Sequence, residues 1–460
     1  MTRRRWLLAG FGAVVLAVAG GIAAWLWYQH ATENREVRGS STVEFVPTEP
    51  VIERRPRAAI RSLPWPTYGY DKRRTHLAPF AHRPPYRRLW MARTGHYLEF
   101  PPTVGYGRVF VTNNTGRLLA LDPRTGKTVW QKRLPYCSAA SPTLALGLVF
   151  TSFLPRPCSY GSRSRPGAVM AMTARTGKLV WRRSLASEST PLVVGRLVYV
   201  GAWDRRIYAL YARTGKVAWS FRTDAEVNSS LAYAAGVVYV GTNGGSLYAL
   251  DSRTGRLRWR ARSFSRFVHG REYFYATPTV AYGRVYASNT DGTVYAFGAA
   301  TGHLLWAKHA GTYVYTAPAV WRRRVYVGTY DGRFYALDAA TGDVRWVWSA
   351  PGSIHGAPTV MDGLVYFATC GTCGQRGSRY AKRGPRATFA LDALTGKLVW
   401  RFPDGHYSPL VADRTRVYLA GSTRVYALSP AGAKKKQPAR TQARSRPAAR
   451  RDTTSGRRAQ

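Results

Sequence analysis

The residue types that could do chemistry recur at one position of a repeated unit. Each unit contains a short apolar run that opens on a small residue and a proline, as in Thr-Pro-Thr-Val at 277–280. The residue three positions before this proline differs from unit to unit, and in the fourth unit Leu231 replaces the proline. In chain order these residues are Glu99, Ala139, Glu188, Asn228, Tyr275, Tyr315, His355 and His406.

Two carboxylates, an amide, two phenols and two imidazoles would meet at one mouth if the runs surround a common axis. Neighbouring hydroxyls, such as those of Ser189 and Tyr407, would add to them. Such a ring of polar groups suits a hydrated ligand, a sugar or a peptide segment. The alternative is that the same residues only line a water-filled channel.

Four cysteines fall into two clusters, and both clusters lie in or beside long inserts at 153–167 and 368–388. Cys137 and Cys158 belong to one unit, which favours a disulfide between them. Cys370 and Cys373 form Cys-x-x-Cys in another unit. An even count outside the cytoplasm favours structural disulfides over a zinc site or a redox pair, which remain alternatives.

The two inserts and their edges are rich in arginine and are our candidate rim for an anionic partner. These residues are Arg156, Arg163, Arg165, Arg376, Arg379, Arg383 and Arg386. The sequence contains no phosphate-binding Gly loop ending in Lys-Ser/Thr, no His-Glu-x-x-His and no Gly-x-Ser-x-Gly, so we assign no catalytic residue and no metal ligand.

The elements that must position these residues come from a strong internal repeat. Seven segments match Ala-x-x-x-x-Thr-Gly-x-x-x-Trp, and their tryptophans recur about every 40 to 50 residues, a period typical of propeller blades. Alternating apolar runs joined by Asp-Gly, as at 283–297, predict hairpins. Each unit therefore reads as four strands.

An eighth unit, 408–430, stops after three strands, and a lone strand around Trp90 stands before the first unit. We predict that this N-terminal strand completes the last blade, so that an all-β, eight-bladed propeller closes without a free edge. The tryptophans that we assign to packing between blades are Trp90, Trp130, Trp181, Trp219, Trp259, Trp306, Trp346 and Trp400.

The repeat, the opening WPTYGYDKRRTH at 65–76 and the tryptophan at each blade end resemble pyrroloquinoline-quinone (PQQ) repeat propellers. That family includes quinoprotein dehydrogenases and BamB-like outer-membrane assembly factors. The dehydrogenases hold calcium with carboxylate and amide oxygens, and Glu188 and Asn228 are of those types. They also use a catalytic Asp and a disulfide between adjacent cysteines, and the sequence has neither at the matching positions. We therefore expect no cofactor, with PQQ and calcium only under the enzyme alternative.

The N-terminus predicts a membrane anchor. Residues 3–5 are arginines, which we place in a cytoplasmic tip (1–5), and residues 6–28 are uncharged and long enough to cross a bilayer as one helix. A cleaved signal peptide is the alternative. We expect a flexible stalk at 29–64, the propeller at 65–430 outside the cytoplasm, and a disordered basic tail at 431–460.

The formal net charge of +46 favours polyanionic partners such as anionic lipid or surface polysaccharide, although general use of Arg at solvated positions explains it equally simply. The leading hypothesis is a non-enzymatic, monomeric binding or scaffold propeller of the cell envelope, similar to BamB-like factors, that binds envelope proteins or anionic polymers and not nucleic acid. The alternatives are a PQQ-dependent dehydrogenase and a sensor or lectin-like receptor for surface glycans.

Overall fold

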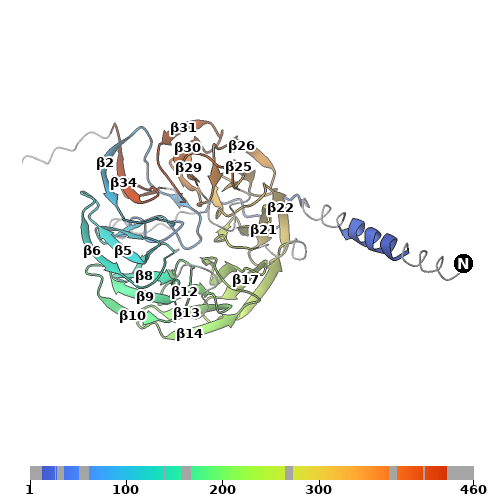
Figure 1. Cartoon of the computed structure of the whole chain (residues 1–460), viewed down its shortest axis with the longest axis horizontal. Coiled ribbons are helices and arrows are strands. Elements are labelled where there is room, and N and C mark those ends of the chain that lie inside the picture. Colours follow the sequence, from blue (N-terminus) through green and yellow to red (C-terminus); the bar gives the residue numbers. More distant parts are fainter. Residues whose placement is uncertain are drawn as a thin grey trace, which may run out of the picture.

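The computed structural model shows a ring of eight β-sheets around a central channel (Figure 1). The structure describes residues 13–25, 27, 36–50, 62–138, 140–156, 167–264, 273–371, 381–407 and 410–432. The four strands of each blade pair antiparallel with their neighbours, and in the first seven blades they follow chain order from the channel outwards. The predicted eight-bladed propeller is confirmed.

The strand bounds of the first four blades are β3–β6 (Thr103–Gly105, Arg108–Thr112, Arg117–Leu121, Thr128–Arg133), β7–β10 (Thr143–Ala145, Leu148–Phe153, Ala168–Thr173, Leu179–Arg183), β11–β14 (Leu192–Val194, Leu197–Ala202, Arg206–Tyr211, Val217–Arg222) and β15–β18 (Ala232–Ala234, Val237–Gly241, Ser246–Asp251, Leu257–Arg262). Blades five to seven are β19–β22 (Thr279–Ala281, Arg284–Ser288, Thr293–Gly298, Leu304–His309), β23–β26 (Ala319–Trp321, Arg324–Gly328, Arg333–Asp338, Val344–Ser349) and β28–β31 (Thr359–Met361, Leu364–Cys370, Ala387–Asp392, Leu398–Phe402). The eighth blade is β32 (Val411–Ala412), β33 (Val417–Ala420), β34 (Arg424–Pro430) and β2 (Tyr86–Arg93). The seventh sheet also takes in β1 (Leu77–Ala78) and β27 (Ser353–Ile354).

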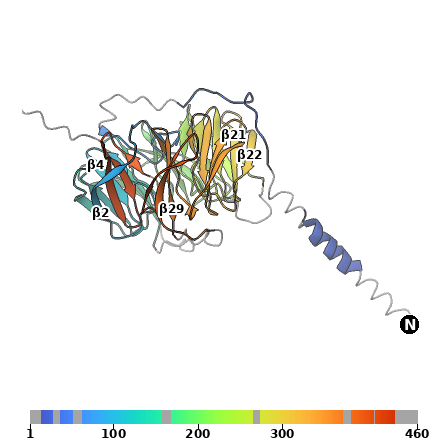
Figure 2. The same cartoon turned by 90° about the horizontal axis from the view of Figure 1, so that it is seen from above.

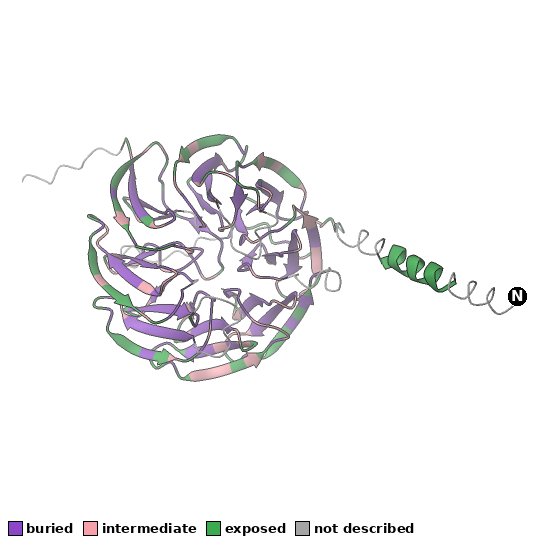
Figure 3. Ribbon diagram, viewed as in Figure 1, coloured by how far each residue is buried: buried purple, intermediate pink, exposed green. Residues whose placement is uncertain are grey.

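The register of the two outer strands explains the positions of alanine and tryptophan in the repeated motif. A bulge in the fourth strand places each motif tryptophan opposite the motif alanine of the third strand, as in Trp259 against Ala249. The small alanine leaves the indole free to lie over the next blade. There the indole N–H donates to a turn carbonyl, as Trp259 Nε1 does to Ala299 O at 3.0 Å. The second and third strands are the most buried, and the outermost strands are exposed (Figure 3).

The N-terminal strand closes the ring as predicted. Strand β2 pairs antiparallel with β34, and Trp90 lies opposite Ala427 across the same bulge that the other blades have. The Trp90 indole then donates to Pro123 O at 3.0 Å in the first blade. Closure therefore reproduces the seam found between the other blades.

Residues 36–50, which we name the strap, lie along blades five and six, although the sequence predicts a flexible stalk there. Val37 forms a bridge with Ala307 on the outer strand of blade five, and Phe45 is buried against Tyr282. The fully buried Arg284 donates to the carbonyls of Glu44, Ser40 and Val43 in the strap. The strap is held by this buried guanidinium, which satisfies three of its carbonyls, and by backbone hydrogen bonds such as that from Val46 N to Tyr282 O at 3.0 Å. Residues 29–35 and 51–61 of the predicted stalk lie outside the described residues.

Residues 62–78, which we name the floor segment, lie inside the ring. Their backbone hydrogen-bonds to six inner strands in turn, from Trp65 with Val104 in blade one to His76 O with Val360 N in blade seven. The four strands between these ends are β7, β15, β19 and β23. In the centre, the fully buried Arg74 donates to Leu231 O at 2.9 Å and to Thr67 Oγ1 at 2.8 Å. The chain thus builds an inner lining from its own N-terminal region.

A helix at residues 13–25 stands away from the propeller (Figures 1 and 2). Within the described part of the chain, no helix is both long and apolar enough to cross a membrane. Residues 1–12, 26 and 28 of the predicted tip and anchor lie outside the described residues, as does the predicted basic tail after residue 432.

Candidate functional site: a pocket at the mouth of the channel

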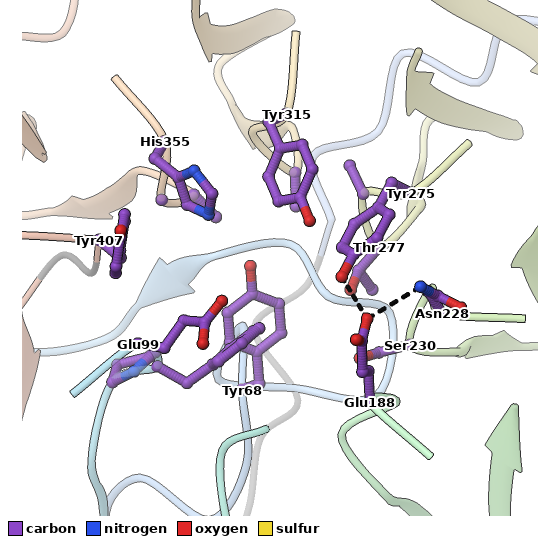
Figure 4. A pocket seen from close by; sticks show the side chains of 16 residues that line it. Tyr68, Glu99, Glu188, Asn228, Ser230, Tyr275, Thr277, Tyr315, His355 and Tyr407 are labelled. Atoms are coloured by element: carbon purple, nitrogen blue, oxygen red, sulfur yellow. Dashed lines mark hydrogen bonds between the residues drawn. The ribbon is translucent and has the colours of Figure 1, made fainter. Parts of the chain in front are cut away.

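Six of the predicted ring residues line one pocket at the centre of the propeller. They are Glu99, Glu188, Asn228, Tyr275, Tyr315 and His355, contributed by six blades (Figure 4). The empty space measures about 530 Å³, counted out to the open solvent at the mouth. Each of these residues precedes an inner strand, so the strand starts set their positions.

The floor segment contributes Tyr68 to the same pocket. Tyr68 packs edge-on against His76 and Phe100, with ring centroids 5.0 and 5.9 Å apart. Burial raises the pKa of the Tyr68 phenol well above its usual value, so the hydroxyl stays protonated at any physiological pH. The light-blue ribbon of the N-terminal part passes behind the pocket side chains in Figure 4.

One side of the pocket is acidic. The buried Glu188 carboxylate accepts a hydrogen bond from Asn228 Nδ2 at 2.9 Å and another from the Tyr275 hydroxyl. Burial, helped by the charge of Glu188, raises the pKa of Glu99 to about 7, while a hydrogen bond from Asn114 acts in the opposite direction. The two carboxylates therefore influence each other electrostatically, and Glu99 changes its charge near neutral pH.

The other side of the pocket is an arc of aromatic rings from four blades. Tyr275 to Tyr315, Tyr315 to His355, and His355 to Tyr407 are each 4.4 Å apart between ring centroids. The Tyr330 hydroxyl contacts His355 Nδ1 at 2.5 Å. Burial lowers the pKa of His355 to about 3, with a smaller effect from His406, so the imidazole is neutral. The arc offers ring faces and no positive charge.

One predicted ring position differs from the expectation, and another is not tested. His406 does not line the pocket, because it stacks on Tyr97 and lies against Tyr407, whose ring takes its place at the wall. Burial lowers the pKa of His406 to about 4, with Arg386 adding to the effect. Ala139 lies outside the described residues.

Tyr68 is one of the pocket residues that sequence reasoning missed, together with Phe100, Ser230 and Thr277. The repeat directs attention to the blades, and the floor segment belongs to none of them. The available signal was a Pro-bearing polar and aromatic stretch, 65–76, placed between the predicted stalk and the first strand. A segment without a blade of its own is the natural candidate to fill a channel.

The predicted rim and disulfides are described only in part. Arg156 donates to Tyr136 O at 3.1 Å, and Arg383 and Arg386 lie on the segment that precedes β30. Cys137 and Cys370 are disulfide-bonded, and neither is a free thiol. Arg163, Arg165, Arg376, Arg379, Cys158 and Cys373 lie outside the described residues, so the pairing stays a prediction.

The fold and its tryptophan seams define a repeat propeller of the PQQ class. The family described as "Outer membrane protein assembly factor BamB" matches residues 84–152, 160–231, 222–316 and 291–456. The chain belongs to this family of PQQ-repeat propellers.

Individual relatives match over shorter stretches. The outer membrane protein assembly factor BamB of Escherichia coli K12 is 28% identical over 122 residues, which are 26% of this chain and 31% of that protein. The chain thus aligns with about a third of the length of this curated relative. The crystal structure of BamB from Moraxella catarrhalis superposes with a TM-score of 0.60 at 17% identity and covers 75% of this chain and 99% of that one.

An enzyme structure is similar to the same degree. The quinohemoprotein alcohol dehydrogenase ADHIIG from Pseudomonas putida HK5 gives a TM-score of 0.63 at 14% identity, over 85% of this chain and 82% of that chain. At this identity both structural likenesses establish the fold alone.

Proposed function

We propose that this protein is a non-enzymatic binding propeller of the cell envelope, and that the pocket face is its recognition surface. The observation that carries the proposal is the pocket itself, which eight separate segments of the chain build at the centre of the ring. Such concave sites, mostly apolar with a few placed polar groups, are where propellers and other scaffolds take up ligands. Its polar groups can bind a ligand through hydrogen bonds, and among the described lining residues we find no nucleophile paired with a general base.

A scaffold role similar to that of the BamB relatives is supported by the family match. We propose that the propeller lies outside the cytoplasm and that residues 6–28 hold it at the membrane as a single-pass anchor, on the strength of the apolar sequence and the preceding arginines. The contacts between the strap and blades five and six would then fix the ring close to its anchor, because only residues 29–35 separate the two.

A quinone-dependent dehydrogenase is the rival, favoured by the neighbouring Glu188 and Asn228 oxygens. The lining residues do not fit its cofactor. PQQ is a tricarboxylate, and the pocket presents Glu99 and Glu188 while no described lining residue is cationic. Among the residues that the structure describes, no group of three or more His, Cys, Asp or Glu side chains is placed to hold a metal ion. Burying the three carboxylates of PQQ beside those of Glu99 and Glu188 would cost more free energy than the contacts in the pocket supply.

Site-specific photo-crosslinking in intact cells tests the binding proposal. A photoreactive residue in place of the exposed Tyr97, beside the pocket, should capture a discrete partner. The same substitution of Tyr211, an exposed residue next to an outer turn of blade three, is the matched control and should capture none. Equal capture at the two positions, or none at either, would contradict a recognition role for the pocket face.

Reconstitution with PQQ and calcium tests the rival. A cofactor absorbance band together with dye-linked oxidation of alcohols or sugars would replace our proposal with the enzyme. A glycan sensor would instead show saturable binding of a defined sugar with no turnover.

A further inference from the structure

The pocket differs in charge from the molecule around it. The chain has a formal net charge of +46, yet the described residues that line the pocket include two carboxylates and no Lys or Arg. His355, the one lining residue that could become cationic, stays neutral because burial disfavours its charge. Arg386 acts on His406 and Tyr407 at the blade-eight end and does not line the pocket.

The two sides of the pocket complement one kind of ligand. Carboxylates attract and accept hydrogen bonds from an ammonium group. Tyrosine rings attract a cation to their faces when its charge lies within about 6 Å of a ring centroid, and they also pack against alkyl carbon. Glu188 is already oriented by Asn228 and Tyr275, so it is held in place before any ligand arrives.

We propose that this pocket binds a protonated alkyl amine, whose ammonium group contacts the carboxylates of Glu99 and Glu188 and whose carbon chain lies along the rings of Tyr275, Tyr315 and Tyr407. This inference rests on the proposed binding function and names the ligand class of that same site. A free amine and a lysine side chain of a partner protein share this chemistry.

A metal ion and a neutral polyol are the competing occupants. No group of three or more His, Cys, Asp or Glu side chains is placed to hold a metal ion among the described residues, so calcium would have to take most of its roughly six to eight oxygen ligands from groups other than carboxylates. A neutral polyol could accept and donate hydrogen bonds here but would bring no charge opposite to that of the carboxylates. The ammonium group meets both requirements.

Isothermal titration calorimetry on the purified full-length protein tests the proposal with four probes. Putrescine should bind saturably at about one molecule per chain. The isosteric 1,4-butanediol should bind about tenfold more weakly or worse, because it carries no charge. Glutarate should not bind, and calcium chloride alone should bind more weakly than putrescine. Equal binding of diol and diamine, binding of glutarate, or tighter binding of calcium would overturn the proposal, as would no binding of putrescine.

Variants locate the site. Glu188→Gln should weaken putrescine binding about tenfold or more, and Tyr315→Leu should also bind less tightly. The control Tyr211→Leu, at an exposed position next to an outer turn of blade three, should bind like the wild type. Unchanged binding in both Glu188→Gln and Tyr315→Leu would place the amine elsewhere and sink the proposal. N-acetyl-lysine methylamide imitates a lysine side chain of a partner protein and should bind if the ligand is such a side chain. Its side-chain-acetylated derivative carries no charge and should not bind. If only free amines bind, the ligand is a small amine.

The pH profile of the wild-type protein is a second readout that needs no variant. Among the described residues, the groups that act on Glu99 include Glu188, Asn114, Tyr330 and Tyr407, and the neutral His355 lies nearby. Since Glu99 loses its proton near pH 7, putrescine affinity should rise from pH 6 to about 8. A flat profile would contradict a role for Glu99. Loss of putrescine binding with crosslinking retained at Tyr97 would reject the amine alone and leave the binding function standing.

Discussion

At the scale of single residues, the contact between neighbouring blades depends on a tryptophan of one blade and a glycine of the next. The glycine of each Thr-Gly turn has a positive φ, as at Gly255 with φ +74°, and it lies under the tryptophan of the preceding blade. A Cβ at Gly255 would lie 2.6 Å from Trp219 Cε3. The motif therefore keeps glycine for two reasons, backbone conformation and contact with the indole.

Gly255→Ala separates these two reasons when it is compared with Gly236→Ala. Gly236 has φ +83° and open space within 4 Å of the position that a Cβ would take, so its alanine variant suffers the backbone strain alone. We expect Gly255→Ala to cost about 1–3 kcal/mol more in thermal or urea unfolding, because the indole must also move. Equal losses would show that the seam tolerates a methyl group.

Glu99 gives the unfolding free energy a pH dependence. Its pKa is about 7 in the folded protein against an ordinary 4.5, so the folded state holds the proton more tightly between these values. Stability should therefore fall as pH rises from about 4.5 to 7 and stay low above that. Melting temperatures of Glu99→Gln should vary less with pH over this range. Parallel curves for the two proteins would mean that Glu99 titrates normally.

At the scale of elements, the sequence predicts the repeated blades and does not predict the strap or the floor segment, each of which occurs once. The pairing of Trp90 with Ala427 was predictable, because both belong to motifs seen seven times elsewhere. Six ring positions that line the pocket were predictable because they are counted from a strand start, which a proline marks in every unit except the fourth, where Leu231 replaces it. The strap and the floor segment have no period, and their hydrogen-bond partners lie on distant blades, so no local pattern indicates where they lie.

The strap depends on Arg284, whose side chain donates to five carbonyls, three in the strap and two in blade six. The matched residue is Arg324, at the same strand position in blade six, which donates to Ala393 O and Leu394 O and has no strap contact among its hydrogen bonds in the described structure. We expect Arg284→Met to cost about 2 kcal/mol or more, since buried carbonyls lose their donor.

Limited proteolysis distinguishes release of the strap from general destabilisation. Cleavage between residues 36 and 50 should become much faster in Arg284→Met and should not change in Arg324→Met. Strap cleavage at the same rate in both variants would show that other contacts, such as that of Phe45 with Tyr282, are sufficient.

At the scale of the whole molecule, the N-terminal hundred residues complete a ring whose other parts are repetitive. The strap covers the outer edge of blade five, the floor segment lines the channel, and β2 closes the eighth blade. These are three separate contributions to stability from one stretch of chain, and deletions can remove them one at a time.

A deletion series tests this division. Loss of residues 1–61 should leave a monomer with a modestly lower melting temperature. Loss of 1–83 should also abolish the pocket floor and amine binding. Loss of 1–93 should expose the edge of β34 and cause oligomers or aggregates, which size-exclusion chromatography would reveal. A monomeric product of the last deletion would mean that the ring stays closed without β2.

The floor segment also constrains the order in which the chain folds during its synthesis. Residues 62–78 leave the ribosome early, yet their hydrogen-bond partners extend to Val360, which is synthesised almost three hundred residues later. The segment therefore cannot complete its hydrogen bonds until Val360 has been made, and β2 waits longer still, for β34. A chain of this design has to be kept from premature collapse until synthesis, and any export, is nearly finished. In such a protein, one of the last steps of folding is the pairing of the N-terminal strand β2 with β34 near the other end of the propeller.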